Sequence, residues 1–139
     1  MTSSGHFEDG VHRFDVRVYF EDTDFSGIVY HANYLKFCER GRSEMLRLAG
    51  VHHAQLTTQG LHFVVRRMEC DFRASARIDD VLQVETRVVR FSGARLEMAQ
   101  SVVLDRRILF HADVTIAMID LSGRPQRLPS EIIDAIART

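Results

Sequence analysis

The stretch from Val18 to Leu48 constrains the fold of this chain more than any other, because its pattern changes twice. It opens as a strand, passes through an acidic loop that holds Gly27, and continues as a long amphipathic helix. Asp24 lies just before the turn, and His31 lies where the helix should begin. The start of a helix presents unpaired backbone N–H groups and the positive end of the helix dipole. A carboxylate beside such donors can act as a base or nucleophile while the donors polarise a carbonyl group. We therefore interpret this junction as the candidate active site.

The spacing of apolar residues predicts a helix over residues 32–48. One face repeats at intervals of four and three residues, as a helix requires, through Tyr34, Cys38, Gly41, Met45 and Leu48. Glycine weakens a helix interior, so its place on this face indicates a close approach by the sheet. Gly50 follows as a stop signal.

Most of the remaining chain is predicted to be strand. Residues 14–20 alternate apolar and polar side chains, as in a half-buried strand. Four more strands follow the helix, with apolar positions over residues 68–72, 82–88, 96–104 and 109–119. The last is more apolar on both sides, so we expect it to be central. Residues 51–60 predict a short helix or turn, and Ser130 is a candidate N-cap for a helix over residues 131–137.

A strand, a long helix and then consecutive strands are typical of the α+β class, with an antiparallel sheet of about five strands covered by helix on one face. The length of 139 residues indicates one domain. We expect residues 1–11 to be flexible and residues 12–139 to form the domain. One helix cannot cover both faces of such a sheet, which predicts at least a homodimer and favours a homotetramer.

Composition excludes several functional classes. The 18 basic residues are balanced by 19 acidic ones, so no electrostatic surface for nucleic acid is predicted. No apolar run could span a membrane and no signal peptide precedes the first strand, so we expect a cytoplasmic protein. Cys38 and Cys70 fall at predicted core positions and are expected to be reduced.

Other candidate residues have simpler interpretations. Asp22 is expected to face away from Asp24 and to be structural. Ser26 lacks the G-x-S-x-G context of a serine hydrolase nucleophile. His52 and His53 have no third ligand at suitable spacing, so no metal site is predicted. We also expect no cofactor.

The segment F-E-D-T-D-F-S-G-I-V-Y-H-A-N-Y, over residues 20–34, resembles the signature of hotdog-fold acyl-CoA thioesterases of the 4-hydroxybenzoyl-CoA thioesterase family. It is most similar to the branch called Tol–Pal system-associated acyl-CoA thioesterases. The resemblance continues through F-V-V-R-R-M and A-R-I-D-D-V-L-Q-V-E-T, and covers most of residues 13–129. It implies a sheet curled around one central helix, with active sites at a dimer interface.

The resemblance assigns site residues at matching positions. The catalytic aspartate of the family corresponds to Asp24, and the amide that polarises the thioester carbonyl corresponds to His31 or Tyr30. Gly27 corresponds to a glycine that lets substrate approach the backbone, and Val29 is also assigned to substrate binding. The family's basic cluster for nucleotide phosphates is reduced here to two candidates, which are Arg90 and Arg95. Glutamates on the central helix catalyse in other hotdog branches, so Glu39 and Glu44 remain alternatives.

The resemblance implies hydrolysis of acyl-CoA, or of acyl carrier protein thioesters, to a carboxylate and a free thiol. Two alternatives stay open. One is a hotdog dehydratase or hydratase, in which His31 and a carboxylate move a proton. The other is a non-catalytic acyl-binding accessory protein of the cell-envelope machinery.

Overall fold

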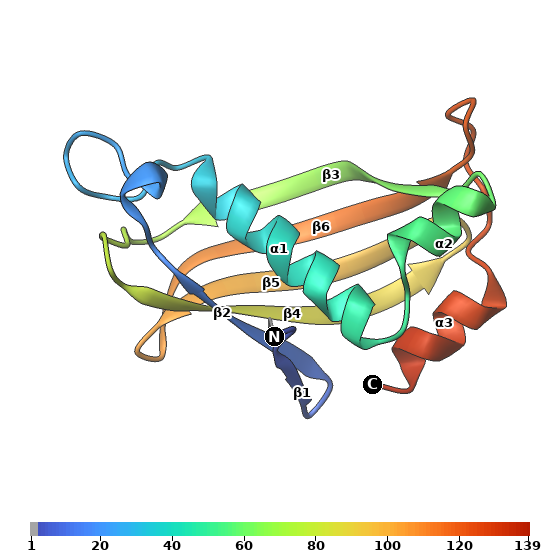
Figure 1. Cartoon of the computed structure of the whole chain (residues 1–139), viewed down its shortest axis with the longest axis horizontal. Coiled ribbons are helices and arrows are strands. Elements are labelled where there is room, and N and C mark those ends of the chain that lie inside the picture. The colour runs from blue at the N-terminus through green and yellow to red at the C-terminus, as the bar shows by residue number, and fades with distance from the viewer. Residues whose placement is uncertain (1–2) are drawn as a thin grey trace.

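The computed structural model describes residues 3–139 and has the α+β architecture that the sequence predicts (Figure 1). Six antiparallel strands form one sheet in the order β1-β2-β4-β5-β6-β3. The strands are β1 (His6–Glu8), β2 (Val11–Arg17), β3 (His62–Phe72), β4 (Val81–Ser92), β5 (Arg95–Leu104) and β6 (Arg107–Ile119). The helices are α1 (Asn33–Leu48), α2 (His53–Thr58) and α3 (Ser130–Ala137), with a 3-10 turn, η1, at Phe20–Asp22.

Helix α1 lies across one face of the sheet and contacts β2, β4 and β5 (Figure 1). The predicted apolar face is buried from Tyr34 to Met45, but Leu48 is 44% exposed at the end of the helix. Gly41 marks the closest approach, since a Cβ atom built there would lie 2.6 Å from Cγ1 of Val84 on β4. The prediction that Gly41 admits the sheet is therefore confirmed.

The opposite face of the sheet is more polar than the sequence predicts. β6 does lie inside the sheet, between β5 and β3. On the face of β6 toward the helix, the residues are apolar. On the opposite face, the alternate positions include His111, Asp113 and Thr115. His111 Nδ1 lies 2.9 Å from Oγ of Ser101, and its Nε2 lies 3.2 Å from Oδ1 of Asp113. An apolar second face on β6 is thus not a reason for oligomerisation.

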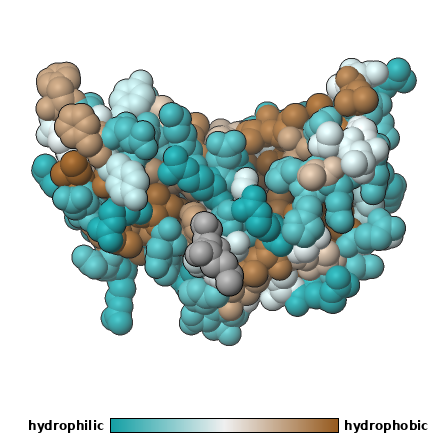
Figure 2. Space-filling model, in the orientation of Figure 1, coloured by the Kyte–Doolittle hydropathy of each residue, from teal (hydrophilic) through white to brown (hydrophobic). Residues whose placement is uncertain are grey.

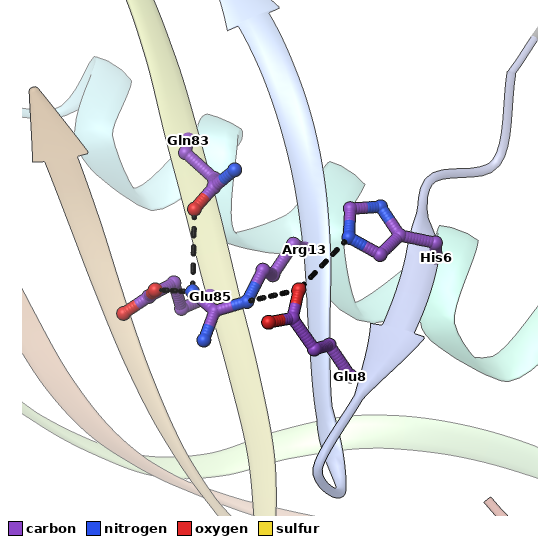
Figure 3. Close-up of polar contacts among 5 residues, drawn as sticks. All are labelled: His6, Glu8, Arg13, Gln83 and Glu85. Carbon is purple, nitrogen blue, oxygen red and sulfur yellow. Dashed lines mark hydrogen bonds and ion pairs between the residues drawn. The ribbon is translucent and has the colours of Figure 1, made fainter.

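The segment that the sequence predicts to be flexible, residues 1–11, includes strand β1 and the start of β2. His6–Glu8 pairs with β2, and Figure 3 shows the polar contacts that join this hairpin to β4. Arg13 bonds Glu85 and donates to Oε1 of Gln83 at 3.3 Å, while its Nε lies 3.8 Å from Oε2 of Glu8. Residues 1–2 of the predicted flexible segment lie outside the described residues.

The smaller helices lie near the far end of α1 (Figure 1). α2 falls within the predicted residues 51–60 and ends before Gly60. α3 begins at Ser130 itself, and its N-cap is Pro129, with no capping side chain. Within residues 3–139, no helix combines the length and apolar character needed to cross a membrane.

Candidate active site

A cavity of about 380 Å³ opens at the start of α1 and brings several predicted site residues together. Its lining combines the loop before the helix, the helix start and the segment after β3. The lining residues are Asp24, Ile28, Val29, Tyr30, His31, Tyr34, Phe72, Arg73, Ala74 and Ser75. Asp24, Val29, Tyr30 and His31 therefore share one cavity although they come from different parts of the junction.

Asp24 is solvent-accessible and held in a tight turn. Its Oδ1 accepts hydrogen bonds from the backbone N–H of Ser26, at 2.8 Å, and from the Ser26 hydroxyl. These bonds stabilise the charged carboxylate, and with the hydroxyl bond as the largest cause they lower the pKa of Asp24 below its ordinary value. Asp24 is thus ionised near neutral pH.

The turn after Asp24 is closed by backbone bonds. The N–H of Asp24 donates to the carbonyl of Ile28 at 2.9 Å, and the N–H of Gly27 donates to the carbonyl of Asp24 at 3.1 Å. Gly27 has a φ of +85°, a conformation that glycine adopts without strain. Gly27 lies in this turn and is not among the residues that line the cavity.

The amide donors at the helix start differ from the prediction in one respect. The N–H of Tyr30 donates to the carbonyl of Asp22 at 2.9 Å, so it is not free to bind a substrate carbonyl. Intrahelical bonding starts with the N–H of Asn33, which donates to Tyr30 at 2.8 Å. Among residues 3–139, no acceptor is bonded to the amides of His31 and Ala32. Ala32 precedes α1 and has no side chain that could cap it.

Aromatic residues form one wall of the cavity. The rings of His31 and Tyr30 have centroids 4.6 Å apart, and His31 meets Phe72 edge-on at 6.0 Å. Tyr34 is buried, stacks on Phe110 at 5.3 Å and accepts a hydrogen bond at its hydroxyl from the N–H of Ala76 at 2.9 Å. The phenol thereby fixes the segment that follows β3 against the helix.

Two predicted residues lie elsewhere. Arg90 and Arg95 belong to the β4–β5 end of the sheet and are not among the residues that line the Asp24 cavity. Nε of Arg90 forms an ion pair with Glu97 at 2.5 Å, and Arg95 lies opposite Ala117 of β6. The structure does not bring either arginine to Asp24 within this chain.

The sequence does not predict several residues of this site. Ser26 is weighed above only as a nucleophile. Its D-x-S spacing from Asp24 is typical of a turn in which the aspartate accepts bonds from the residue two positions later. Phe72 and the residues after it carry no local signal, because only the sheet brings the end of β3 to the helix start.

The two glutamates of the central helix lie away from the Asp24 cavity. Glu39 lines a separate cavity between α1 and β3, and Glu44 bonds Arg47 on α1.

Among residues 3–139, no group of three or more histidine, cysteine, aspartate or glutamate side chains could hold a metal ion. The site combines an ionised carboxylate with a partly aromatic cavity, and the cavity lining includes His31, one of the two residues at the helix start whose amides have no acceptor within residues 3–139.

Comparisons with known proteins identify the family of this chain. The family model described as "Thioesterase-like superfamily" matches residues 18–136. The acyl-CoA thioester hydrolase YbgC of Escherichia coli is 40% identical over 123 residues, which are 87% of this chain and 92% of that protein. The acyl-CoA thioesterase YbgC of Haemophilus influenzae is 42% identical over 121 residues, covering 86% of this chain and 89% of the relative.

A solved structure shows the same fold. The crystal structure of a probable thioesterase from Bartonella henselae superposes with a TM-score of 0.82 at 48% identity, covering 86% of this chain and 99% of that one. The hotdog fold and the family resemblance are thus confirmed, and the chain belongs to the thioesterase-like superfamily.

Proposed function

We propose that this protein is an acyl-CoA thioesterase, which hydrolyses acyl-CoA to a carboxylate and free coenzyme A. The observation that carries the proposal is the ionised Asp24 in one cavity with the helix start where two amides are unpaired. The relatives named as acyl-CoA thioester hydrolases, which match more than four fifths of the chain, support the same activity.

The reaction needs a base or nucleophile and donors for the oxyanion. With Asp24 as base, a water oxygen bonds to the thioester carbonyl carbon while the carboxylate takes its proton. The carbonyl oxygen becomes negative and is stabilised by the amides of His31 and Ala32, an effect worth about 3 kcal/mol per donor in other enzymes. The C–S bond then breaks, and the thiolate leaves and takes up a proton. Direct attack by Asp24 through a mixed anhydride would use the same residues.

Replacing Asp24 tests this proposal. Asp24→Asn keeps the size and the turn but removes the base, and we expect kcat/KM to fall by about 10⁴-fold or more, beyond the usual contribution of one acid–base group. The measurement is release of free thiol from a panel of acyl-CoA substrates, from acetyl to palmitoyl with benzoyl derivatives. Near-normal hydrolysis by a folded Asp24→Asn variant would reject the assignment.

We also propose a dimer formed along β3. This strand is an edge of the sheet, is 11 residues long and is largely exposed, and Val64 and Val65 on it are 38% and 47% exposed. A long edge strand offers unpaired backbone groups to another strand. Antiparallel pairing of two β3 strands would join the sheets and place the Asp24 cavity, with Phe72 at the end of β3, near the interface.

The resemblance also supports finer proposals: acyl carrier protein thioesters as further substrates, assembly of dimers into a tetramer, a role beside the Tol–Pal system and a cytoplasmic location. Comparing turnover of the same acyl group on coenzyme A and on the carrier protein tests the first. Light scattering tests the second, and co-purification and cell fractionation test the others.

A further inference from the structure

We propose that Asp22 and Asn33 are positioning residues, which together set the start of α1 against the catalytic loop and determine which amides remain for the oxyanion. This inference rests on the proposed function, because it concerns the same site. It assigns a role in turnover to a pair of residues that do not line the Asp24 cavity.

The two side chains form a buried pair. Asp22 is 4% exposed and Asn33 is 8% exposed, and Nδ2 of Asn33 donates to Oδ1 of Asp22 at 2.9 Å. The other oxygen, Oδ2, accepts from the N–H of Tyr19 at 2.9 Å. Burial of a carboxylate lowers the stability of the folded state unless the carboxylate is hydrogen-bonded, so these bonds offset the cost of burying Asp22.

Asp22 also holds the far end of the loop through its backbone. Its carbonyl accepts the N–H of Tyr30 at 2.9 Å. Between Asp22 and Tyr30, residues 23–29 form a loop whose two ends are joined by the isolated bridge between Thr23 and Val29. One residue thus joins the entry to the loop, the exit from the loop and the first turn of α1.

This arrangement has a consequence for the amides. Because the Tyr30 N–H is bonded to Asp22 and the Asn33 N–H is bonded within the first turn, the donors left between them are His31 and Ala32. Rotation of the helix start would move these two N–H groups relative to Asp24. Oxyanion stabilisation depends on donors placed within about 0.5 Å of the productive geometry. Loss of the Asp22–Asn33 bond should therefore lower kcat more than it raises KM.

Exchange of the two side chains tests this inference. Asn33→Asp places two carboxylates against each other, and we expect kcat to fall about 100-fold, as for loss of one oxyanion donor. Asp22→Asn is milder, because an amide at position 22 still accepts from Tyr19 and donates to the oxygen of a flipped Asn33. The double variant Asp22→Asn with Asn33→Asp keeps the bond from the Tyr19 N–H and restores the bond between positions 22 and 33 in the opposite sense, and we expect kcat within about threefold of the wild type.

Thr86→Val is the matched control. Thr86 is fully buried, and its hydroxyl accepts a hydrogen bond from Nε2 of Gln100 at 2.9 Å on the sheet under α1. Its loss should lower the melting temperature and leave kcat per folded molecule unchanged. Folding of every variant is measured by circular dichroism, and kcat and KM are measured on one acyl-CoA substrate.

The outcomes separate this inference from the proposed function. If the wild type hydrolyses no acyl-CoA, the proposed function fails. If the wild type is active and folded Asn33→Asp keeps its kcat, the positioning role is rejected. The role is also rejected if the exchange variant is folded but as inactive as Asn33→Asp. Should Asn33→Asp fail to fold, the kcat of folded Asn33→Ala, which removes the bond without adding a charge, decides: a fall supports the role and an unchanged value rejects it.

Discussion

At the scale of single residues, the junction between loop and helix separates two neighbouring aspartates into different roles. Asp24 is accessible, with Oδ1 bonded to Ser26, whereas Asp22 is buried with both oxygens bonded. From the sequence, Asp22 is expected to face away from Asp24, but strand alternation cannot be the cause, because it places residues two positions apart on the same face. The reason is the η1 turn, which directs Asp22 inward to the start of α1.

Ser26 should control the ionisation of Asp24. The Ser26 hydroxyl and amide lower the pKa of Asp24 by stabilising the carboxylate, so removing the hydroxyl should raise this pKa toward the ordinary value. Activity that needs the carboxylate is lost as pH falls through this pKa, and in Ser26→Ala the loss should begin at higher pH. The measurement is the acid limb of kcat/KM against pH. Ser92→Ala, in the exposed β4–β5 turn, is the control, and coincident acid limbs for all three proteins would contradict the prediction.

His31 should matter far less than Asp24. A thiol with a pKa of about 8.5 leaves readily as a thiolate, so hydrolysis needs little general acid, and the backbone amide survives in His31→Ala. We expect a loss of about tenfold or less in kcat/KM, well below the effect of removing a general acid or base. If His31→Ala is as inactive as Asp24→Asn, the imidazole has a direct role, as a dehydratase would require.

The cysteines predict a simple labelling result. Burial raises the pKa of Cys38 to about 12, so the thiolate fraction at pH 8 is about one in ten thousand. Burial also raises the pKa of Cys70, but this residue on β3 is only partly buried. Iodoacetamide should therefore modify Cys70 first and Cys38 only on unfolding, as read by mass spectrometry of the digested protein. Equal labelling rates in the native protein would show that the α1 face is open.

At the scale of elements, apolar periodicity predicted the central helix and the strands that follow it. The helix predicted over residues 32–48 is observed over residues 33–48, and the four strands predicted after it are all present, although β3 begins at His62 and the prediction covered only residues 68–72 of it. Periodicity failed for segments whose structure depends on whether another segment pairs with them. β1 is a polar segment that becomes a strand because β2 pairs with it, and residues 18–20 leave the sheet although they continue its pattern. The sequence predicts the loop and helix-start residues that line the Asp24 cavity. It does not predict the wall at residues 72–75, because only tertiary contacts bring that segment to the site.

Gly41 provides a test of how closely α1 meets the sheet. A Cβ atom at this position would lie 2.6 Å from Cγ1 of Val84, a stiff β-branched side chain. Alanine improves helix propensity by up to about 1 kcal/mol, but overpacking costs about 1–3 kcal/mol. We expect Gly41→Ala to lower the free energy of unfolding by about 1 kcal/mol, measured in urea. Because Val84→Ala makes room, the double variant should be more stable than the sum of the single effects, and strict additivity would contradict the contact.

At the scale of the whole molecule, apolar surface gathers at the end that carries the candidate site. Figure 2 shows apolar side chains standing out at the end where Figure 1 places the loop after η1. Phe20 and Phe25 are 81% and 106% exposed, and Phe72 at the end of β3 is 48% exposed. Such groups are unusual on a monomer surface and are typical of surfaces that contact a partner. The β3 edge and the aromatic loop together therefore favour a second copy of the chain at this end.

Charge on the β3 edge should break this assembly. Lysine side chains on edge strands oppose edge-to-edge pairing, so Val65→Lys should shift the protein toward a monomer at micromolar concentration, as measured by light scattering. Val89→Lys is the matched control, because Val89 is 57% exposed but lies on β4, which is inside the strand order of the sheet and not on the β3 edge. With the cavity beside the end of β3, a monomeric Val65→Lys protein should also lose thioesterase activity while its circular dichroism is unchanged. A wild-type monomer, or a Val65→Lys protein that assembles as the wild type does, would place the interface elsewhere.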